Sequence, residues 1–351
     1  MVFPISFCIN AFSMCLCGKK CISHNKILTL QITYFSIFVQ TLHMIKRYLP
    51  FLLPAILLLL SFKPGDKTTN NPPVNVQADS IAFAIIGDYG RDTPQEDSVA
   101  KMVKSWNPDF IITVGDNNYP LGSASTINAH IGKYYCDYIY NPDAPVSQQC
   151  NGKATREKFN RFFPSPGNHD NYTKGAKPYR NYFTLPGDEN NYEFTWGPVH
   201  FYSINSGTEG NTAPQVKDWL KNSLASNKLP FKLVYFHHPP FSSGSHGSAP
   251  NMQWPFHDWG VDAVLAGHEH FYAKVIDNKE KTPVYLICGS SGTDEHYDCN
   301  KHPIDPSRFA WQCDNVHFGA IKVRATAHKV IFEYYTIEAP SAPSDTYIID
   351  K

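Results

Sequence analysis

Residues 110–119 read Phe-Ile-Ile-Thr-Val-Gly-Asp-Asn-Asn-Tyr, and this stretch decides the fold of the chain. Its first five residues are apolar or β-branched and follow Pro108, which is typical of a buried strand that ends in a loop at Gly115. Asp116 then begins the loop. A glycine–aspartate pair by itself is an ordinary turn. A carboxylate at the carboxyl end of a buried strand, however, lies on the rim where open α/β sheets bind ligands.

The same layout recurs at four other places in the chain. Each time an apolar run ends in residues that can bind metals: Asp88 after Ile85-Ile86-Gly87, Asn168-His169-Asp170 after Pro166-Gly167, His237 after Val234-Tyr235-Phe236, and His268-Glu269-His270 after Leu265-Ala266-Gly267. Turn residues and exposed histidines would explain any one of these motifs, but not all five together. The sequence therefore predicts a metal site assembled from loops.

The candidate ligands are mostly oxygen and imidazole donors, and none is a thiolate. Such a set suits Zn, Mn, Fe or Ni rather than a structural zinc site. Six or seven ligands are too many for one tetrahedral ion but suit two ions that share a ligand. Two ions about 3.5–4 Å apart can hold both the attacking and the leaving oxygen of a phosphoryl displacement. The pattern therefore indicates a binuclear hydrolytic centre.

Elements alternate along the first half of the chain, and the last third is mostly β. We expect strands at 81–87, 109–115, 191–196, 198–204, 231–236, 262–266, 270–276, 283–288, 316–323 and 328–337. We expect helices at 94–105, 153–162 and 213–226, and a short one near 252–258. The helix at 94–105 has Thr93 as its N-cap and Pro94 in its first turn. This order predicts the α/β class, with two packed mixed β-sheets flanked by helices.

The chain has 351 residues, with 31 basic and 31 acidic side chains. A formal net charge of zero gives no reason to expect a nucleic acid or an anionic membrane surface as the main partner. We expect a monomer that acts on small molecules.

The N-terminal region differs from the rest. Met44-Ile45-Lys46-Arg47 precedes a short apolar run that ends at Leu60, which suits a signal peptide. An N-terminal membrane anchor is the alternative. We expect residues 1–43 to be a dispensable or wrongly assigned extension, 44–62 the signal or anchor, 63–79 a linker, 80–340 the catalytic domain and 341–351 a C-terminal tail. The protein would then be secreted or periplasmic, or anchored outside the cytoplasm.

An oxidising compartment would allow disulfides among the cysteines of the domain. Cys136 with Cys150, and Cys299 with Cys313, lie close in sequence within polar loops and are the natural pairs. Cys288 lies in an apolar run and is expected to be a buried free thiol. Connectivity is not decided by the sequence alone.

At the metal-binding motifs the chain resembles the calcineurin-like metallophosphoesterase superfamily, and within it the short, tartrate-resistant type of purple acid phosphatase. Tyr119 lies three residues after Asp116, where the purple enzymes supply a tyrosinate. His246 follows His237 by nine residues, the spacing that these enzymes use for a further histidine at the site. The resemblance covers about residues 80–337 and implies a four-layer αββα sandwich.

The resemblance also implies roles for the individual residues. A ferric ion would be held by Asp88, Asp116, Tyr119 and His270, and a divalent ion (Fe, Zn or Mn) by Asn168, His237 and His268, with Asp116 bridging the two. The implied reaction is in-line attack of a hydroxide held by the metals on a phosphomonoester. His169 would donate a proton to the leaving group, and His246 would contact the substrate or position solvent. We expect His238 to be structural, because adjacent side chains at a strand end point apart, and Glu269 to be turned away from the metals.

Three functions remain open on the sequence. The first is an acid phosphatase of the purple type. The second is a phosphodiesterase or nucleotidase of the same superfamily with a metal pair that lacks iron. The third is a secreted binding module without catalysis, which the complete set of ligands argues against.

Overall fold

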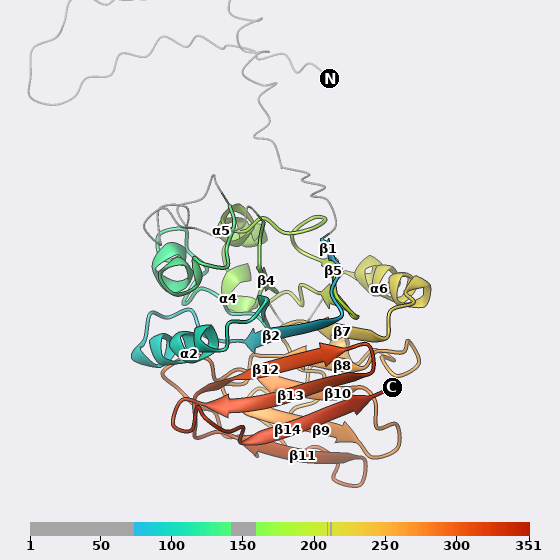
Figure 1. Cartoon of the computed structure of the whole chain (residues 1–351). Helices are drawn as coiled ribbons and strands as arrows, with labels where there is room; N and C mark the ends of the chain where they lie inside the picture. Colours follow the sequence, from blue (N-terminus) through green and yellow to red (C-terminus); the bar gives the residue numbers. More distant parts are fainter. Residues whose placement is uncertain (1–73, 142–158, 209, 211–212) are drawn as a thin grey trace, which may run out of the picture. The chain divides into compact units, whose positions relative to one another are not determined.

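The computed structural model describes residues 74–141, 159–208, 210 and 213–351 (Figure 1). They belong to a compact unit that starts at Thr69. The expected extension, signal or anchor segment, and Cys150 with its expected bond to Cys136, lie outside the described residues.

The described residues form two mixed sheets. One has six strands in the order β14-β13-β12-β2-β3-β4. Its strands are β2 (Ser80–Ile86), β3 (Phe110–Thr113), β4 (Phe162–Pro164), β12 (Gly319–Thr326), β13 (Lys329–Thr336) and β14 (Asp345–Asp350). Strands β2, β3 and β4 are parallel neighbours, with Phe83 opposite Phe110 and Ile112 opposite Phe163. Their carboxyl ends therefore lie along one edge of the sheet.

The other sheet has eight strands in the order β1-β5-β6-β7-β8-β10-β9-β11. They are β1 (Asn75–Val76), β5 (Tyr192–Trp196), β6 (Val199–Ser203), β7 (Phe231–Tyr235), β8 (Ala263–Ala266), β9 (Tyr272–Asp277), β10 (Val284–Cys288) and β11 (Phe309–Asp314). Strands β6, β7, β8 and β10 run parallel. The candidate ligands of the second half of the chain follow β7 and β8.

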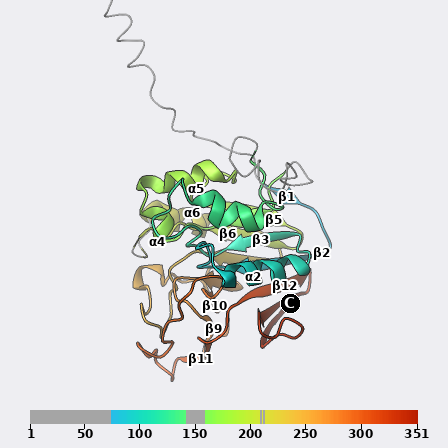
Figure 2. The same ribbon diagram turned by 90° about the vertical axis from the view of Figure 1, so that its left-hand side faces the viewer.

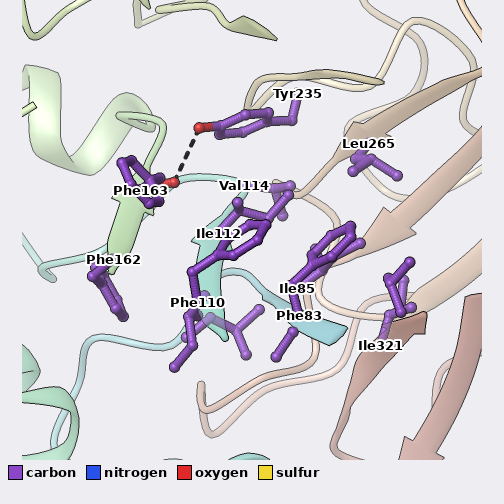
Figure 3. Close-up of a cluster of buried hydrophobic side chains, with 14 of the residues drawn as sticks. Phe83, Ile85, Phe110, Ile112, Val114, Phe162, Phe163, Tyr235, Leu265 and Ile321 are labelled. Atoms are coloured by element: carbon purple, nitrogen blue, oxygen red, sulfur yellow. Dashed lines mark hydrogen bonds between the residues drawn. The ribbon is translucent and has the colours of Figure 1, made fainter. Parts of the chain in front are cut away.

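The main hydrophobic core lies between the two sheets. Figure 3 shows Phe83 and Phe110 from the six-stranded sheet in the same buried cluster as Tyr235 and Leu265 from the eight-stranded sheet. The Phe110 ring packs against five other aromatic rings within 6 Å of it. The Tyr235 hydroxyl donates a hydrogen bond to the Phe163 carbonyl oxygen across the two sheets, at 3.1 Å. This packing holds the ends of β3, β4 and β7 close to one another.

Helices flank both sheets (Figures 1 and 2). Helix α2 (Pro94–Ser105) begins at Thr93, whose side chain accepts a hydrogen bond from the Glu96 backbone N–H. Helix α6 (Pro214–Ser226) buries Leu220 and Leu224 in a second cluster with Val234. On β7, Leu233 and Tyr235 face the main core while Val234 faces this cluster, as the two-residue period of a strand requires. The remaining helical segments are short: η1 (Asn128–Gly132), α3 (Lys133–Tyr135), α4 (Asn168–Asn171), η4 (Lys174–Ala176), α5 (Lys177–Tyr182) and η5 (Pro250–Met252).

The expected fold class is confirmed: two mixed sheets pack together with helices beside them. The expected strands and the two longer helices lie within two residues of their expected positions, except that β12 begins and ends three residues later than expected. Strand β11 was not expected. The expectation for 153–162 is wrong at its end, since Phe162 begins β4, and residues 153–158 lie outside the described residues. The short helix expected near 252–258 is wrong too. A three-residue helix occupies 250–252 instead, and Pro255 interrupts the segment that follows it.

Strands also occur in the expected linker and tail. β1 lies within 63–79 and pairs with β5, and β14 lies within 341–351 and pairs with β13 over its whole length. Cys299 and Cys313 form the expected disulfide, and Cys288 is the expected buried free thiol. Within the described part of the chain, no helix combines the length and the apolar character needed to cross a bilayer.

Candidate metal centre

The candidate ligands follow the carboxyl ends of five strands. Asp88, Asp116 and Asn168 come after β2, β3 and β4 of the six-stranded sheet, and Tyr119 lies in the loop that Asp116 begins. His237 comes after β7, and His268 and His270 come after β8, all from the eight-stranded sheet. Two of these ends are joined directly, because the Asp88 backbone N–H donates to the Gly115 carbonyl at 3.0 Å. The structure therefore brings all seven predicted ligand residues to one place.

A glycine precedes a candidate ligand at four of the strand ends, and none of these glycines has room for a side chain. A Cβ at Gly115 would overlap the His237 ring, one at Gly167 the Asp116 carboxylate, and one at Gly267 the Asp88 carboxylate. At Gly87 it would meet the Val114 side chain and the Cys288 backbone. The strand ends approach so closely that each turn requires a residue without Cβ.

Three of the ligand residues themselves adopt left-handed backbone conformations. The φ angle is 52° at Asp88, 51° at Asp116 and 71° at His268. Such angles are uncommon for residues other than glycine and cluster at functional sites, where the surrounding structure maintains them. Here they turn each side chain from its strand toward the others.

One group of ligand atoms consists of Tyr119, Asp88 and His270. The Tyr119 hydroxyl lies 3.2 Å from Asp88 Oδ1 and 3.2 Å from His270 Nε2. His270 Nε2 is 3.7 Å from Asp88 Oδ1. Burial raises the pKa of Tyr119, and the Asp116 and Asp88 carboxylates raise it further.

A second group consists of His237, Asn168, His268 and Asp116. His237 Nε2 lies 2.9 Å from Asn168 Oδ1, 3.2 Å from His268 Nδ1 and 3.3 Å from Asp116 Oδ2. The two groups are close to each other, because Asp88, Asp116 and His237 each place a ligand atom within 4.8 Å of the others.

This second group fits a metal ion. His237 Nδ1 is 3.0 Å from the Val114 carbonyl and donates to it, which leaves Nε2 to face the oxygens of Asn168 and Asp116. When the His237 ring is neutral, its Nε2 and the oxygens of Asn168 and Asp116 are all hydrogen-bond acceptors. The cluster therefore needs a cation among them. Two ligands about 2.1 Å from one tetrahedral ion are about 3.4 Å apart, which is close to the distances found here.

The pKa values in the metal-free protein reflect the same need for positive charge. Burial lowers the pKa of His237, but the Asp116 and Asp88 carboxylates outweigh it and raise the pKa to about 9. Burial raises the pKa of Asp116, but His237 and His169 outweigh it and hold the pKa below its usual value. A proton on His237 thus supplies the charge that a metal ion would supply.

The two predicted catalytic histidines lie beside this cluster. His169 Nδ1 is 2.6 Å from the Pro120 carbonyl, and its Nε2 is 3.9 Å from Asp116 Oδ2. The His246 ring stands 4.2 Å from the His268 ring. The buried Glu269 carboxylate accepts hydrogen bonds from the backbone N–H groups of His246 and Gly247, each at 3.0 Å. Glu269 therefore fixes the loop that carries His246, in line with its expected orientation away from the ligands.

His238 lies closer to the candidate ligands than expected. Its ring centroid is 4.4 Å from that of His268, and one of its ring nitrogens groups with those of His237 and His268 within 4.8 Å. The argument that adjacent side chains diverge fails because residues 237–239 follow the end of β7 and no longer keep the geometry of a strand. His238 Nδ1 is 2.8 Å from Ser206 Oγ. Burial lowers the pKa of His238 to about 3.

A cavity of about 410 Å³ opens over the cluster. Its lining includes Asp116, Asn168, His169, His246, His268 and His270. It also includes Tyr172 and Tyr297, which no sequence motif predicted. Tyr297 stacks on His270 with ring centroids 4.1 Å apart. Its position depends on loop packing, so no local pattern could have indicated it, whereas Tyr172 lies one helical turn after Asn168 and could have been noticed.

Comparisons with known proteins agree with this geometry. Acid phosphatase type 7 from Danio rerio is 25% identical over 272 residues, which cover 62% of this chain and 57% of the relative. Purple acid phosphatase 17 from Arabidopsis thaliana is 23% identical over 290 residues, which cover 72% of this chain and 80% of the relative. The match to the Danio rerio protein thus spans less than two thirds of that relative's length.

Solved structures share the fold. A purple acid phosphatase from yellow lupin (Lupinus luteus) seeds superimposes with a TM-score of 0.61 at 16% identity, covering 78% of this chain and 54% of the lupin chain. GAP50, described as the anchor in the inner membrane complex of Plasmodium, gives a TM-score of 0.53 at 18% identity, covering 78% of this chain and 89% of that one. The model of the calcineurin-like phosphoesterase family matches residues 81–272, which include every candidate ligand. The chain belongs to the calcineurin-like phosphoesterase family.

Proposed function

We propose that this protein is an acid phosphatase that hydrolyses phosphomonoesters at a pair of metal ions. One observation carries the proposal: ligand atoms from five strand ends converge in two adjoining groups, with Asp116 beside both. The acid phosphatases among the relatives support the same activity. A complete set of ligand residues favours catalysis over a binding role alone.

We assign Asp88, Tyr119 and His270 to one ion and Asn168, His237 and His268 to the other, with Asp116 serving both. The first set contains two or three anionic oxygens and suits a ferric ion, and the second is largely neutral and suits Fe, Zn or Mn as a divalent ion. Because burial raises the pKa of Tyr119, only a highly charged cation beside it would hold the phenolate at mildly acidic pH. When bound, the two ions supply a hydroxide nucleophile and neutralise the phosphate oxygens.

The other residues of the site handle the leaving group and the substrate. His169 donates its Nδ1 hydrogen to the Pro120 carbonyl, so its Nε2 is the nitrogen left to act on a ligand. A proton on Nε2 passes to the ester oxygen as the phosphorus–oxygen bond breaks. His246 reaches the cavity from the loop that Glu269 fixes, and there it contacts the phosphate or orients water.

The disulfide between Cys299 and Cys313 supports a location outside the cytoplasm, where such bonds persist. The substrates there would be small phosphomonoesters.

Metal analysis together with turnover measurements tests the proposal. Purified protein should contain two metal ions per chain, one of them iron, and should hydrolyse para-nitrophenyl phosphate faster than bis(para-nitrophenyl) phosphate at mildly acidic pH. Faster hydrolysis of the diester, or two ions without iron, would move the protein to the phosphodiesterase or nucleotidase alternative. Metal-loaded protein that hydrolyses neither ester would support the non-catalytic alternative.

Colour tests the ferric assignment separately. A phenolate on ferric iron absorbs visible light, so the oxidised protein should be coloured and Tyr119→Phe colourless. The variant should keep part of its activity, because Asp88, Asp116 and His270 remain. Colour that survives the substitution would remove Tyr119 from the ligand set but leave the binuclear site standing.

A further inference from the structure

Tyr172 is an exposed aromatic side chain beside the candidate metal centre. It caps the carboxyl end of α4, and its relative exposure is 52% although it lines the cavity. Its ring contacts the His169 ring edge-on, with centroids 5.0 Å apart. A large aromatic residue left half in solvent at this place has no role in the core of the fold.

The contact that matters joins Tyr172 to the candidate ligand Asn168. The two residues lie one helical turn apart, and the Tyr172 backbone N–H donates to the Asn168 carbonyl at 3.0 Å. At the side-chain level, Asn168 Nδ2 donates to the Tyr172 hydroxyl oxygen at 3.2 Å. The other end of the same amide, Oδ1, faces His237 Nε2 at 2.9 Å.

The two ends of this amide are chemically opposite. The oxygen can bind a cation, whereas the NH₂ group is a donor only. A half-turn about the last side-chain bond would exchange them and direct N–H groups at the place that an ion would occupy. Asn168 is therefore best oriented to bind a metal ion when its NH₂ end has an acceptor elsewhere.

Among the described residues, the Tyr172 hydroxyl is the acceptor that the NH₂ end contacts. We propose that Tyr172 is a positioning residue that holds the Asn168 amide with Oδ1 directed at the divalent ion. This inference rests on the proposed assignment of Asn168, His237 and His268 to that ion. It does not depend on the reaction that the ions perform.

The single-atom variant Tyr172→Phe tests the inference, because it keeps the ring and its contact with His169. The purified full chain is stripped of divalent metal, and its affinity for Zn²⁺ is measured by competition with a chromophoric chelator. Partners that orient a metal ligand commonly change metal affinity by about 10–100-fold. Because water can partly replace the half-exposed hydroxyl, we expect Tyr172→Phe to bind Zn²⁺ about tenfold more weakly than the wild type.

Two further readouts separate positioning from other roles. Excess Zn²⁺ should restore kcat of Tyr172→Phe toward the wild-type value, since the hydroxyl acts on occupancy and not on the chemical step. The metal-free variant should melt at the wild-type temperature, because the substitution is half-exposed. Tyr335→Phe is the matched control: Tyr335 lies on β13, packs on Trp106 and does not line the cavity, so it should bind Zn²⁺ like the wild type.

The outcomes distinguish this inference from the proposed function. Equal Zn²⁺ affinity in Tyr172→Phe and the wild type overturns it, as does a loss of kcat that excess Zn²⁺ does not restore. A wild type that binds Zn²⁺ but hydrolyses no phosphate ester refutes the proposed function and leaves the affinity comparison valid. A wild type that binds no Zn²⁺ overturns this inference and leaves the proposed function to stand with Fe or Mn as the divalent ion.

Discussion

The His237 imidazole donates its Nδ1 hydrogen to the backbone carbonyl of Val114, 3.0 Å away, which follows β3 of the other sheet. Val114 is the last residue before Gly115 and Asp116, so one hydrogen bond joins two of the ligand-bearing strand ends. It also fixes which nitrogen of His237 is available, because Nδ1 is used and Nε2 faces Asn168 and Asp116. The orientation of this ligand is therefore set before any ion binds.

The first prediction concerns Asp116, which we assign to both ions. Asp116→Ala should lose both metals and reduce phosphatase activity to background, because its carboxylate lies beside both groups of ligands. Metal analysis by mass spectrometry together with an activity assay checks this. A variant that retains two ions and full activity would refute the shared role.

The second prediction concerns His169. His169→Ala should keep both metals, because His169 is not in the proposed ligand set. Its turnover of esters with poor leaving groups should fall by about 10²–10⁴, the usual contribution of a positioned acid. Alkyl and nitrophenyl phosphates give the comparison. Equal losses on both kinds of ester would argue against proton donation by His169.

The third prediction concerns the space at Gly115. Both Gly115 and Gly187 have positive φ angles, 99° and 61°, so alanine at either should cost about 1–2 kcal/mol of conformational strain. A Cβ at Gly187 meets no atom closer than 3.7 Å, whereas one at Gly115 overlaps the His237 ring. Gly115→Ala should therefore also lose the divalent ion, and Gly187→Ala should keep it. Metal content in the two variants decides the matter, and equal content in both would contradict the packing argument.

The fourth prediction concerns removal of the metals. Because the ligands come from both sheets, bound ions should stabilise the whole domain. A free ion concentration of 100 times its Kd stabilises a protein by about 2.7 kcal/mol, which corresponds to about 5–10 °C in Tm for a domain of this size. A chelator should lower the Tm of the wild type by this amount and should leave Asp116→Ala unchanged. A chelator effect of the same size in Asp116→Ala would place the stabilising ions elsewhere.

The fifth prediction concerns Glu96, whose buried carboxylate accepts hydrogen bonds from the backbone N–H groups of Arg91 and Asp92 in the loop after β2. Burial raises its pKa well above the usual value. The folded protein therefore holds a proton on the Glu96 carboxyl more tightly than the unfolded chain does. The protonated carboxyl contributes its full stabilisation below about pH 4.3, and this contribution is lost as the pH rises through the folded pKa. Glu96→Gln should therefore gain stability relative to the wild type as the pH rises.

Urea unfolding of the metal-free proteins at pH 5 and pH 8 measures this difference. Glu338→Gln, an exposed position, is the control and should show no such trend. A difference in the free energy of unfolding between Glu96→Gln and the wild type that is the same at both pH values would contradict the prediction.

The sequence was a good guide wherever a ligand directly follows its strand. Asp88, Asp116, His237 and His268 come within three residues of a strand end, and parallel neighbours bring such ends to one edge. Strand β4 was harder to recognise because Pro164 lies in it. It forms nevertheless, because an edge strand does not need every N–H as a donor.

The wall of the cavity could not be predicted in the same way. Tyr297 reaches His270 only through the packing of a loop between distant strands, and His238 reaches His268 because the chain leaves strand geometry after β7. Such contacts are not encoded by spacing along the chain. Tyr172 is the exception, since its distance of four residues from Asn168 is a helical turn.

The four glycines that precede ligands also matter for how relatives of this protein diverge. A lineage that stops using the metals no longer selects for the ligands, and it no longer selects for the empty space beside them either. Substitutions at Gly115, Gly167 and Gly267 would then accumulate together with substitutions of the ligands themselves, whereas Gly87 would stay confined by Val114 and Cys288. A related gene that keeps the ligands but carries bulkier residues at these glycines would already encode a protein that has abandoned catalysis.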